Sequence, residues 1–288
     1  MDRKTCLISG ATSGIGRAAA RELYRRGYDL VLLGRDKTRC EDTIAELGEI
    51  NSEAELRYYL ADLSSLQSVQ ELGKELRRDL TKLDILVNNA GAVFMRDERS
   101  VDGLEMTWAL NHFGYFWLTR EVLPLLKRAS SSIGTARIVN VSSAAHQRAR
   151  FSDLSKVFER KGLLGYFTYG ETKLANIWYT LVLADRLAPD KITVNSMHPG
   201  FVATRFSENN GLMALPLKMV TGIFGLSPEE GAETIVYLVD SDEVDDTTGG
   251  YFVKCKQVEP SKTATRLDQA RELWRLTEEK TEKIIGAL

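Results

Sequence analysis

The stretch TCLISGATSGIG, residues 5–16, decides the fold that we expect for this chain. A short apolar run leads into a turn that carries Gly10, Gly14 and Gly16, and the helix-forming residues RAAAREL follow at once. Glycine permits a tight turn and a close backbone approach, and the start of a helix presents unpaired N–H groups and a positive dipole end. The stretch therefore predicts a strand, a turn and a helix that bind the pyrophosphate of a dinucleotide.

A glycine-rich turn alone is weak evidence, because it can equally be a compact connection between a strand and a helix. The context favours the dinucleotide site. This is the first turn between a strand and a helix, a predicted strand precedes it and a predicted helix follows it, and a second strand comes at the expected distance. The spacing G-x-x-x-G-x-G also differs from the commoner G-x-G-x-x-G.

The rest of the chain alternates between strand-like and helix-like segments. Apolar residues recur at helical spacing in segments such as 16–27 and 68–80, and short β-rich runs separate these segments. The β-rich runs are TCLISG, YDLVLLGR, LRYYLADL, LDILVNNAG, ARIVNVSS, ITVNSMHPG and TGGYFVKCK, the last being read as one strand. Strands joined by helices predict a mostly parallel sheet that is covered on both faces.

The pattern predicts one α/β domain over residues 1–288, a doubly wound Rossmann-type fold with helices on both faces of its sheet. No Pro/Ser-rich linker or shift in composition divides the chain. The helix predicted over SPEEGAETIVYLVDS and a final amphipathic helix over TRLDQARELWRLTEEKTEKI complete the series.

Composition excludes several classes of function. The 38 basic and 40 acidic side chains give a formal charge of −2, which argues against a nucleic-acid surface. The three cysteines and three histidines are scattered, so we expect neither a disulfide framework nor a metal site. The chain has no signal-peptide pattern and no apolar run long enough to span a bilayer, and we expect a cytoplasmic protein.

The second predicted strand ends in LVLLGRDK, where a dinucleotide fold meets the adenosine ribose. An acidic residue there accepts hydrogen bonds from a free 2′-hydroxyl, whereas a guanidinium suits a 2′-phosphate. Arg35 occupies this position, and Arg17 in the preceding helix can add a second positive charge. We therefore expect NADP(H) in preference to NAD(H), the alternative being that Arg35 pairs at the surface with Asp36 or Glu41.

Polar residues follow three further predicted strands. Asp62 ends the third strand, Asn89-Ala90-Gly91 the fourth, and Ser142-Ser143 the fifth. Each alone can be a helix cap or turn former. Because open α/β sheets bind ligands at the carboxyl ends of their strands, the repetition at one edge predicts a shared site.

Tyr169 and Lys173, in YGETK, are four residues apart and so share one face of a predicted helix. The reference pKa of a phenol is about 10, and a nearby ammonium group stabilises the phenolate. Hydride transfer requires a proton partner for the substrate oxygen, and such a phenol is a suitable acid or base. The alternative is an accidental Tyr/Lys pair on a helix surface.

Five motifs, in order over nearly the whole chain, resemble those of the short-chain dehydrogenase/reductase family: GATSGIG, NNAG, VNVSS, YGETK and HPG. The runs ARIVNVSSAAH, YGETKLANI and TGGYFVKCK further resemble its retinol-dehydrogenase-like branch. The resemblance implies that Tyr169 is the acid/base, that Lys173 holds the nicotinamide ribose and lowers the phenol's pKa, and that Ser143 binds the substrate oxygen. Asn111 would hold a water of a proton relay through its backbone carbonyl.

The resemblance also implies a set of residues that line the cofactor. These are Gly10, Ser13, Gly14, Ile15, Gly16, Arg17, Arg35, Asp62, Leu63, Asn89, Ala90, Gly91, Tyr169, Lys173, Pro199, Gly200, Val202 and Thr204.

Two assignments stay open at this point. Successive residues of a strand point to opposite faces, so only one of Ser142 and Ser143 can face the site, and the sequence does not say which. Tyr166 lacks a lysine four residues on, and we interpret it as pocket wall or core rather than as the acid/base.

The run GLMALPLKMVTGIFGL, residues 211–226, is more apolar than a surface segment should be. In the family this position forms the substrate lid, which we expect around residues 205–227, and apolar side chains there imply a lipophilic substrate. The alternatives are an ordinary core helix or a segment in peripheral contact with a membrane.

The sequence therefore predicts an NADP(H)-dependent oxidoreductase that acts on a lipophilic aldehyde, ketone or alcohol. It predicts no nucleic-acid partner, and a homodimer is plausible because many relatives pair through helices beside the active site. The alternatives are a catalytically silent nucleotide sensor or scaffold, and a double-bond reductase resembling the protochlorophyllide reductases.

Overall fold

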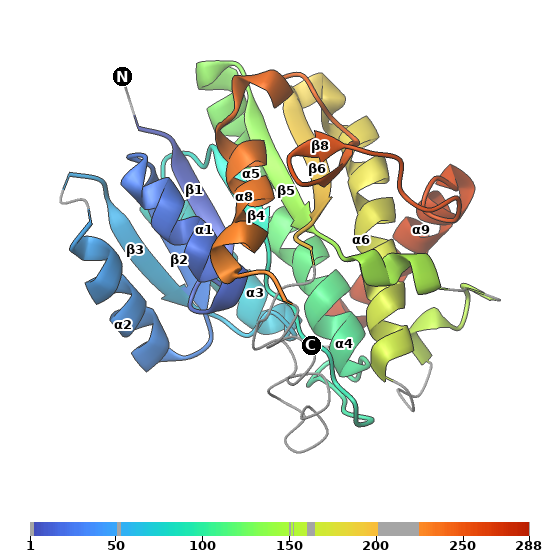
Figure 1. The fold of residues 1–288 in the computed structure, drawn as a ribbon. Coiled ribbons are helices and arrows are strands. Elements are labelled where there is room, and N and C mark those ends of the chain that lie inside the picture. The colour runs from blue at the N-terminus through green and yellow to red at the C-terminus, as the bar shows by residue number, and fades with distance from the viewer. Residues whose placement is uncertain are drawn as a thin grey trace.

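In the computed structural model the chain forms one eight-stranded sheet with helices on both faces (Figure 1). The structure describes residues 3–50, 53–149, 151, 153–159, 165–200 and 225–287. Along the sheet the strand order is β3-β2-β1-β4-β5-β6-β7-β8. Neighbouring strands pair in parallel except β7 and β8, which pair antiparallel. The predicted doubly wound α/β fold is confirmed.

The strands lie close to the predicted runs. Their bounds are β1 Thr5–Ser9, β2 Asp29–Gly34, β3 Leu56–Leu60, β4 Ile85–Asn88, β5 Ala136–Val141, β6 Ile192–His198, β7 Tyr251–Val253 and β8 Lys256–Gln257. The α-helices are α1 Gly14–Arg25, α2 Lys37–Gly48, α3 Leu66–Asp79, α4 Met106–Trp108, α5 Gly114–Ile133, α6 Gly165–Leu187, α8 Pro228–Asp240 and α9 Leu267–Ile285. A π-helical turn, η1 Ala109–Phe113, joins α4 to α5, and short 3₁₀ turns are η2 Ala144–Arg148, η3 Val157–Glu159, η4 Ala188–Asp190 and η6 Asp242–Val244.

Two buried clusters cover the two faces of the sheet. On one face, apolar residues of α1, α2 and α8 pack on the strands. On the other face, residues of α3, α5 and α6 do so. Every residue of β4 and β5 is buried, as expected for central strands of a sheet covered on both sides.

Several helices begin at residues whose side chains cap them. The carboxylate of Asp36 accepts a hydrogen bond from the Arg39 N–H at the start of α2. Ser227 and Glu230 form a reciprocal capping box at the start of α8. Such caps satisfy N–H groups that have no partner within the helix, and they fix where each helix leaves the edge of the sheet.

The strand order reverses direction between β1 and β4, because successive strands run outward from β1 on one side and from β4 on the other. At such a switch point the connecting loops diverge and leave a crevice beyond the carboxyl ends of the strands. The fold thus brings the ends of β1, β4 and β5 together.

The C-terminal region differs from the prediction in one respect. The run TGGYFVKCK forms two short strands, β7 and β8, rather than one. Lys254 and Cys255 between them have φ angles of 49° and 60°. Two consecutive left-handed residues make the tight turn of an antiparallel hairpin, and only glycine or asparagine would have announced that turn in the sequence.

The final helix α9 packs across α5 and α6. The Trp274 ring stacks on Tyr179 at a centroid distance of 5.5 Å and lies edge-on to Phe116 at 5.2 Å. The guanidinium of Arg186 lies 4.3 Å from the centre of the same ring. The Trp274 side chain thus packs on α5 and α6, against the buried cluster on that face of the sheet.

Candidate active site

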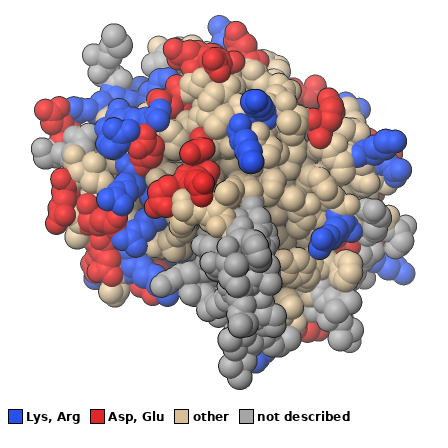
Figure 2. Space-filling model, in the orientation of Figure 1, with Lys and Arg blue, Asp and Glu red and all other residues tan. Residues whose placement is uncertain are grey.

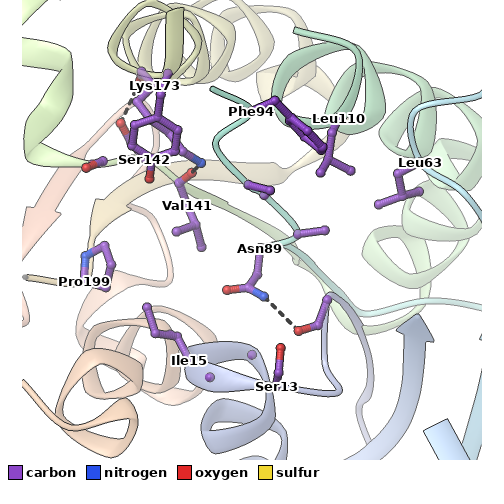
Figure 3. Close-up of a pocket in the computed structure, with 18 of the residues that line it drawn as sticks. Ser13, Ile15, Leu63, Asn89, Phe94, Leu110, Val141, Ser142, Lys173 and Pro199 are labelled. Atoms are coloured by element: carbon purple, nitrogen blue, oxygen red, sulfur yellow. Dashed lines mark hydrogen bonds between the residues drawn. The ribbon is translucent and has the colours of Figure 1, made fainter. Parts of the chain in front are cut away.

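A cavity of about 820 Å³ lies at the carboxyl ends of the central strands (Figure 3). Its size is within the range of cofactor and small-molecule sites. Figure 3 shows Ser13 and Ile15 on one side of the cavity and Lys173 with Ser142 on the opposite side. It is therefore bordered both by the glycine-rich turn and by the YGETK helix.

The glycine-rich turn has the geometry that requires glycine. Gly10 and Gly14 have φ angles of 66° and 52°, in the left-handed region. A Cβ atom on Gly16 would lie 2.4 Å from both the Asn89 Nδ2 atom and the Gly10 carbonyl oxygen. The Ser13 hydroxyl makes no capping bond to α1. The start of α1 thus packs tightly against the neighbouring turn and leaves room and polar groups for a phosphate.

Asn89 ties the first and fourth strand ends together. Its Nδ2 group donates to the carbonyl oxygens of Ser9 at 2.8 Å and Gly10 at 3.3 Å. The backbone N–H groups of Asn89 and Ala90 both donate to the Ser9 hydroxyl. The NNAG motif therefore shapes the turn from behind, and Asn89, Ala90 and Gly91 also line the cavity.

Asp62 forms a turn and lines the cavity at the same time. Its Oδ1 atom accepts hydrogen bonds from the backbone N–H and the hydroxyl of Ser64. The Oδ2 atom takes no hydrogen bond from the described residues. Leu63, which follows, is buried and lines the cavity. The turn-forming role and the predicted cofactor contact are thus compatible at Asp62.

The positive charges at the end of β2 are arranged differently from the prediction. Arg35 is exposed and lines the cavity, as expected. Arg17 does not line it, because its guanidinium is paired with Glu46. Arg39, in the first turn of α2, lines the cavity instead. The spacing of Arg35 and Arg39, four residues apart across the β2–α2 connection, was a signal for this arrangement that the sequence reading missed.

Ser142 and Ser143 are separated by the structure. The Ser142 hydroxyl is buried and donates to the Lys173 carbonyl oxygen at 2.7 Å. The Ser143 side chain hydrogen-bonds to Tyr169 and accepts a bond from the Ala145 N–H at 3.2 Å. Ser142 therefore supports the backbone of α6, whereas Ser143 lies beside the phenol.

Tyr169 and Lys173 face the cavity from α6. The Lys173 Nζ atom lies 5.5 Å from the centre of the Tyr169 ring and donates to the Val141 carbonyl oxygen at 3.0 Å. Lys173 is 2% exposed. Gly91 allows this approach, because a Cβ on Gly91 would lie 3.3 Å from the Lys173 Nζ atom.

Burial shifts the pKa values of both side chains of this pair. Burial raises the pKa of Tyr169 to about 12, the Ser143 hydrogen bond opposes that increase, and Tyr166 adds to it. Burial also lowers the pKa of Lys173 to about 7. The resemblance implies that the ammonium group lowers the pKa of the phenol, whereas the largest effect of this environment, desolvation, acts in the opposite direction. The phenol is therefore protonated at neutral pH, as a general acid must be.

Asn111 lies in the π-helical turn η1 and does not line the cavity. Its side chain pairs with the backbone of Ala92, accepting from the N–H and donating to the carbonyl oxygen, both at 2.9 Å, and it donates to the Thr172 hydroxyl at 3.2 Å. π-Helical turns occur often at functional sites. The buried side chain is thus satisfied by its neighbours, and the backbone carbonyl role stays a prediction.

Part of the cavity wall is apolar. Phe94 and Leu110 lie next to each other in Figure 3, and Met106 and Tyr166 also line this part. Tyr166 is pocket wall, as predicted. The sequence reading missed Phe94, Met106 and Leu110, because they come from an irregular loop and a short helix without a motif of their own. Ala144, Ala145, Gln147 and Arg148 of η2 also line the cavity.

Pro199 and Gly200 line the cavity as predicted, next to His198. Burial lowers the pKa of His198 to about 4, with a contribution from His146. The predicted contacts Val202 and Thr204, and residues 205–224 of the predicted lid, lie outside the described residues.

The structure bears on two further expectations. In the described ranges no group of three or more His, Cys, Asp or Glu side chains is arranged to hold a metal ion. No described helix is long and apolar enough to cross a membrane. On the face shown in Figure 2, acidic and basic side chains are interspersed and form no broad basic surface.

Comparisons with known proteins show a family to which this chain is similar. The family model for short chain dehydrogenases matches residues 4–214. Retinol dehydrogenase 14 of Mus musculus is 38% identical over 293 residues, covering 96% of this chain and 86% of that protein. The short-chain dehydrogenase TIC 32 A, chloroplastic, of Brassica napus is 33% identical, covering 94% of this chain and 86% of that protein.

A solved structure is similar over most of the chain. It is the NADP active-site complex of RhlG from Pseudomonas aeruginosa, with a TM-score of 0.69 and 28% identity, covering 86% of this chain and 93% of that one. The similarity in both sequence and structure extends over the strands and helices that border the cavity.

Proposed function

This chain belongs to the short-chain dehydrogenase/reductase family, in its retinol-dehydrogenase-like branch, and from that premise we propose that it is an NADP(H)-dependent carbonyl reductase and alcohol dehydrogenase for lipophilic substrates. The observation that carries the proposal is that Ser143, Tyr169 and Lys173 line the same cavity as the glycine-rich turn. The family is one of oxidoreductases, and the proposal adds the cofactor preference and the substrate class.

The cavity fits a dinucleotide. The left-handed glycines and the close contact at Gly16 leave the backbone open to a pyrophosphate at the start of α1. No acidic residue stands in the first turn of α1, so the helix end offers an anion no repulsion. Arg35 and Arg39 line the cavity at the end of β2, where a 2′-phosphate would be held, and they support NADP(H) over NAD(H).

The reduced nicotinamide, when bound, supplies the hydride. Three side chains take part in the reaction, acting on the substrate oxygen, the transferred proton or the cofactor. Tyr169, whose pKa is about 12, donates its proton to the carbonyl oxygen. Ser143 donates a hydrogen bond to the same oxygen as negative charge develops there. Lys173 holds the cofactor ribose and stabilises the phenolate that Tyr169 becomes.

The proposed substrate class follows from the apolar side chains that line the cavity. Phe94, Met106 and Leu110 form part of its wall, and an apolar substrate gains about 25 cal/mol for each Å² of surface that it buries there. The predicted apolar lid agrees with this. We propose lipophilic aldehydes or ketones and the corresponding alcohols, with reduction as the favoured direction in the cell.

The proposal is tested by measuring NADPH oxidation with a panel of aldehydes and ketones of different chain length and ring content. We expect turnover that increases with apolar surface. Tyr169→Phe should lower kcat by about 10³-fold, since a positioned acid contributes about 10² to 10⁴. The variant should bind NADPH like the parent by fluorescence titration, which shows that its fold and cofactor site are intact.

Two results would overturn the proposal in different ways. A Tyr169→Phe variant that consumes NADPH as fast as the parent refutes the assignment of the acid. A parent that binds NADPH but reduces no carbonyl in the panel favours the alternative of a nucleotide sensor or scaffold. Reduction of a conjugated carbon–carbon double bond instead of the carbonyl would favour the protochlorophyllide-reductase-like alternative.

A further inference from the structure

The Lys173 ammonium group occupies an unusual environment for a buried charge. Lys173 is 2% exposed, and in the described part of the chain it makes no ion pair with a carboxylate. Taking an unpaired charge out of water is costly unless dipoles or other polar groups replace the water. The groups that surround the Nζ atom therefore decide whether it can carry a charge at all.

Two aromatic rings and one carbonyl oxygen surround this atom. The Nζ atom lies 5.5 Å from the ring centre of Tyr169 and 5.6 Å from that of Tyr115. Both distances are within the range of cation–π attraction, about 6 Å. The Val141 carbonyl accepts a hydrogen bond from Nζ at 3.0 Å.

Tyr115 belongs to a different element from the YGETK motif. It stands in α5, directly after the π-helical turn η1, and is completely buried. Its hydroxyl donates to the same Val141 carbonyl oxygen at 3.5 Å, and Asn176 Nδ2 does so at 3.3 Å. Tyr115 is thus attached to the strand end that also holds Lys173, and its ring is fixed in place.

Among the described residues, the other groups near the ammonium carry no countercharge. The titratable side chains beside it are the phenols of Tyr169 from α6 and Tyr115 from α5. From η1, Asn111 approaches Gly91 with its amide oxygen, which a Cβ on Gly91 would meet at 3.2 Å. Burial raises the pKa of Tyr115 well above its ordinary value, and the electrostatic interaction with Tyr169 adds to this, so the Tyr115 ring stays neutral.

We propose that Tyr115 is a positioning residue of the active site, whose ring holds the Lys173 ammonium group in its charged form and directs it toward the cofactor. This inference deepens the proposed function and rests on it in one respect, that Lys173 acts as a cation. No motif contains Tyr115, and its role follows from the contact between α5 and α6 alone.

The direct test is the ionisation of Lys173 in the cofactor-free protein. Lysines carrying ¹³C at Cε are titrated by NMR, and a Lys173→Met variant assigns the signal. We expect Tyr115→Leu to lower the midpoint by about one pH unit, which corresponds to about 1.4 kcal/mol. Tyr115→Phe keeps the ring face and should titrate within about 0.3 units of the parent.

A second series of variants separates the effect of the ring electrons from a change in packing or folding. Tyr115 is replaced by phenylalanine with one, two or three fluorine atoms, which withdraw electrons from the ring face without changing its shape appreciably. The Lys173 midpoint should fall step by step along this series. A midpoint that stays constant along the series, or that does not fall in Tyr115→Leu, overturns the proposal.

The kinetic readout separates this inference from the proposed function. In Tyr115→Leu the loss of carbonyl-reduction activity with rising pH should begin about one unit lower than in the parent, and the reduction activity should recover at acidic pH. A parent that reduces no carbonyl refutes the proposed function but leaves the NMR titration interpretable. An active parent with an unchanged Lys173 midpoint in the variants refutes only the role of Tyr115.

Discussion

Ser142 and Ser143 are neighbours in the chain, yet their hydroxyls serve different parts of the site: Ser142 donates to the Lys173 carbonyl oxygen at 2.7 Å, and Ser143 hydrogen-bonds to the phenol of Tyr169. The alternation of side chains along an extended backbone produces this division. One serine is thus structural and the other can reach the substrate.

The two serines should respond differently to removal of the hydroxyl. We expect Ser143→Ala to lower kcat by about 10²-fold, as the loss of one donor to a developing oxyanion does, with little change in the melting temperature. Ser142→Ala should retain most of the activity and lose about 1 kcal/mol of unfolding free energy, because a buried hydrogen bond is removed. Steady-state kinetics and urea unfolding measure both, and the reverse pattern would exchange their roles.

The pH dependence of alcohol oxidation should report the ionisation of Tyr169. Oxidation requires the phenolate, and a pKa of about 12 means that its fraction rises about tenfold for each pH unit up to that value. We expect kcat for oxidation to rise continuously from pH 7 to pH 10. A plateau that begins below about pH 8 would show instead that bound cofactor and Lys173 lower the pKa of the phenol.

Cofactor preference should depend on Arg35 and Arg39 and not on Arg17. Removing either cavity-lining guanidinium should weaken NADPH binding by about tenfold or more, since a hydrogen bond to a charged group contributes about 1.5–3 kcal/mol. NADH binding should change little. Arg17→Ala is the matched control, because Arg17 pairs with Glu46 outside the cavity. Equal losses for the two nucleotides in Arg35→Ala and Arg39→Ala would contradict the phosphate assignment.

The packing at Gly16 should tolerate no side chain. A Cβ there would meet the Asn89 amide and the Gly10 carbonyl oxygen at 2.4 Å, and both are held by hydrogen bonds or the backbone. We expect Gly16→Ala to destabilise the protein by about 1–3 kcal/mol and to weaken NADPH binding. Gly27→Ala is not a suitable control because its φ is 89°, but Gly48→Ala, with open space around it, should be close to neutral. Equal stability of the Gly16 and Gly48 variants would refute the close contact.

Acid should destabilise the protein through His198. Burial lowers its pKa from 6.5 to about 4, so the unfolded chain binds a proton more readily than the folded protein. The stability that this histidine contributes is complete above about pH 6.5, is lost progressively as the pH falls to about 4, and is constant below. His198→Asn keeps an acceptor for the Gly200 N–H. Between pH 6.5 and pH 4 the unfolding free energy of the parent should decrease by roughly 2–3 kcal/mol more than that of His198→Asn. An equal decrease in the two proteins would disprove the assignment to His198.

The sequence predicted the elements that carry local signals. The alternation of apolar patterns predicts the succession of strands and helices along the chain. Glycines and capping residues indicate where several helices start. The four-residue spacing of Tyr169 and Lys173 is sufficient to place both on one face of α6. Turns made by ordinary residues gave no such signal, and the hairpin at Lys254 and Cys255 was read as a single strand.

The tertiary structure decided everything that depends on elements far apart in the chain. Which serine faces Tyr169, which arginine lines the cavity, and that Tyr115 approaches Lys173 all follow from how strands and helices pack across one another. The same burial raised the pKa of Tyr169 and lowered that of Lys173, although their spacing alone suggested the opposite for the phenol. Sequence periodicity fixes which face of an element is apolar, but desolvation and cross-element contacts exist only once the faces have met.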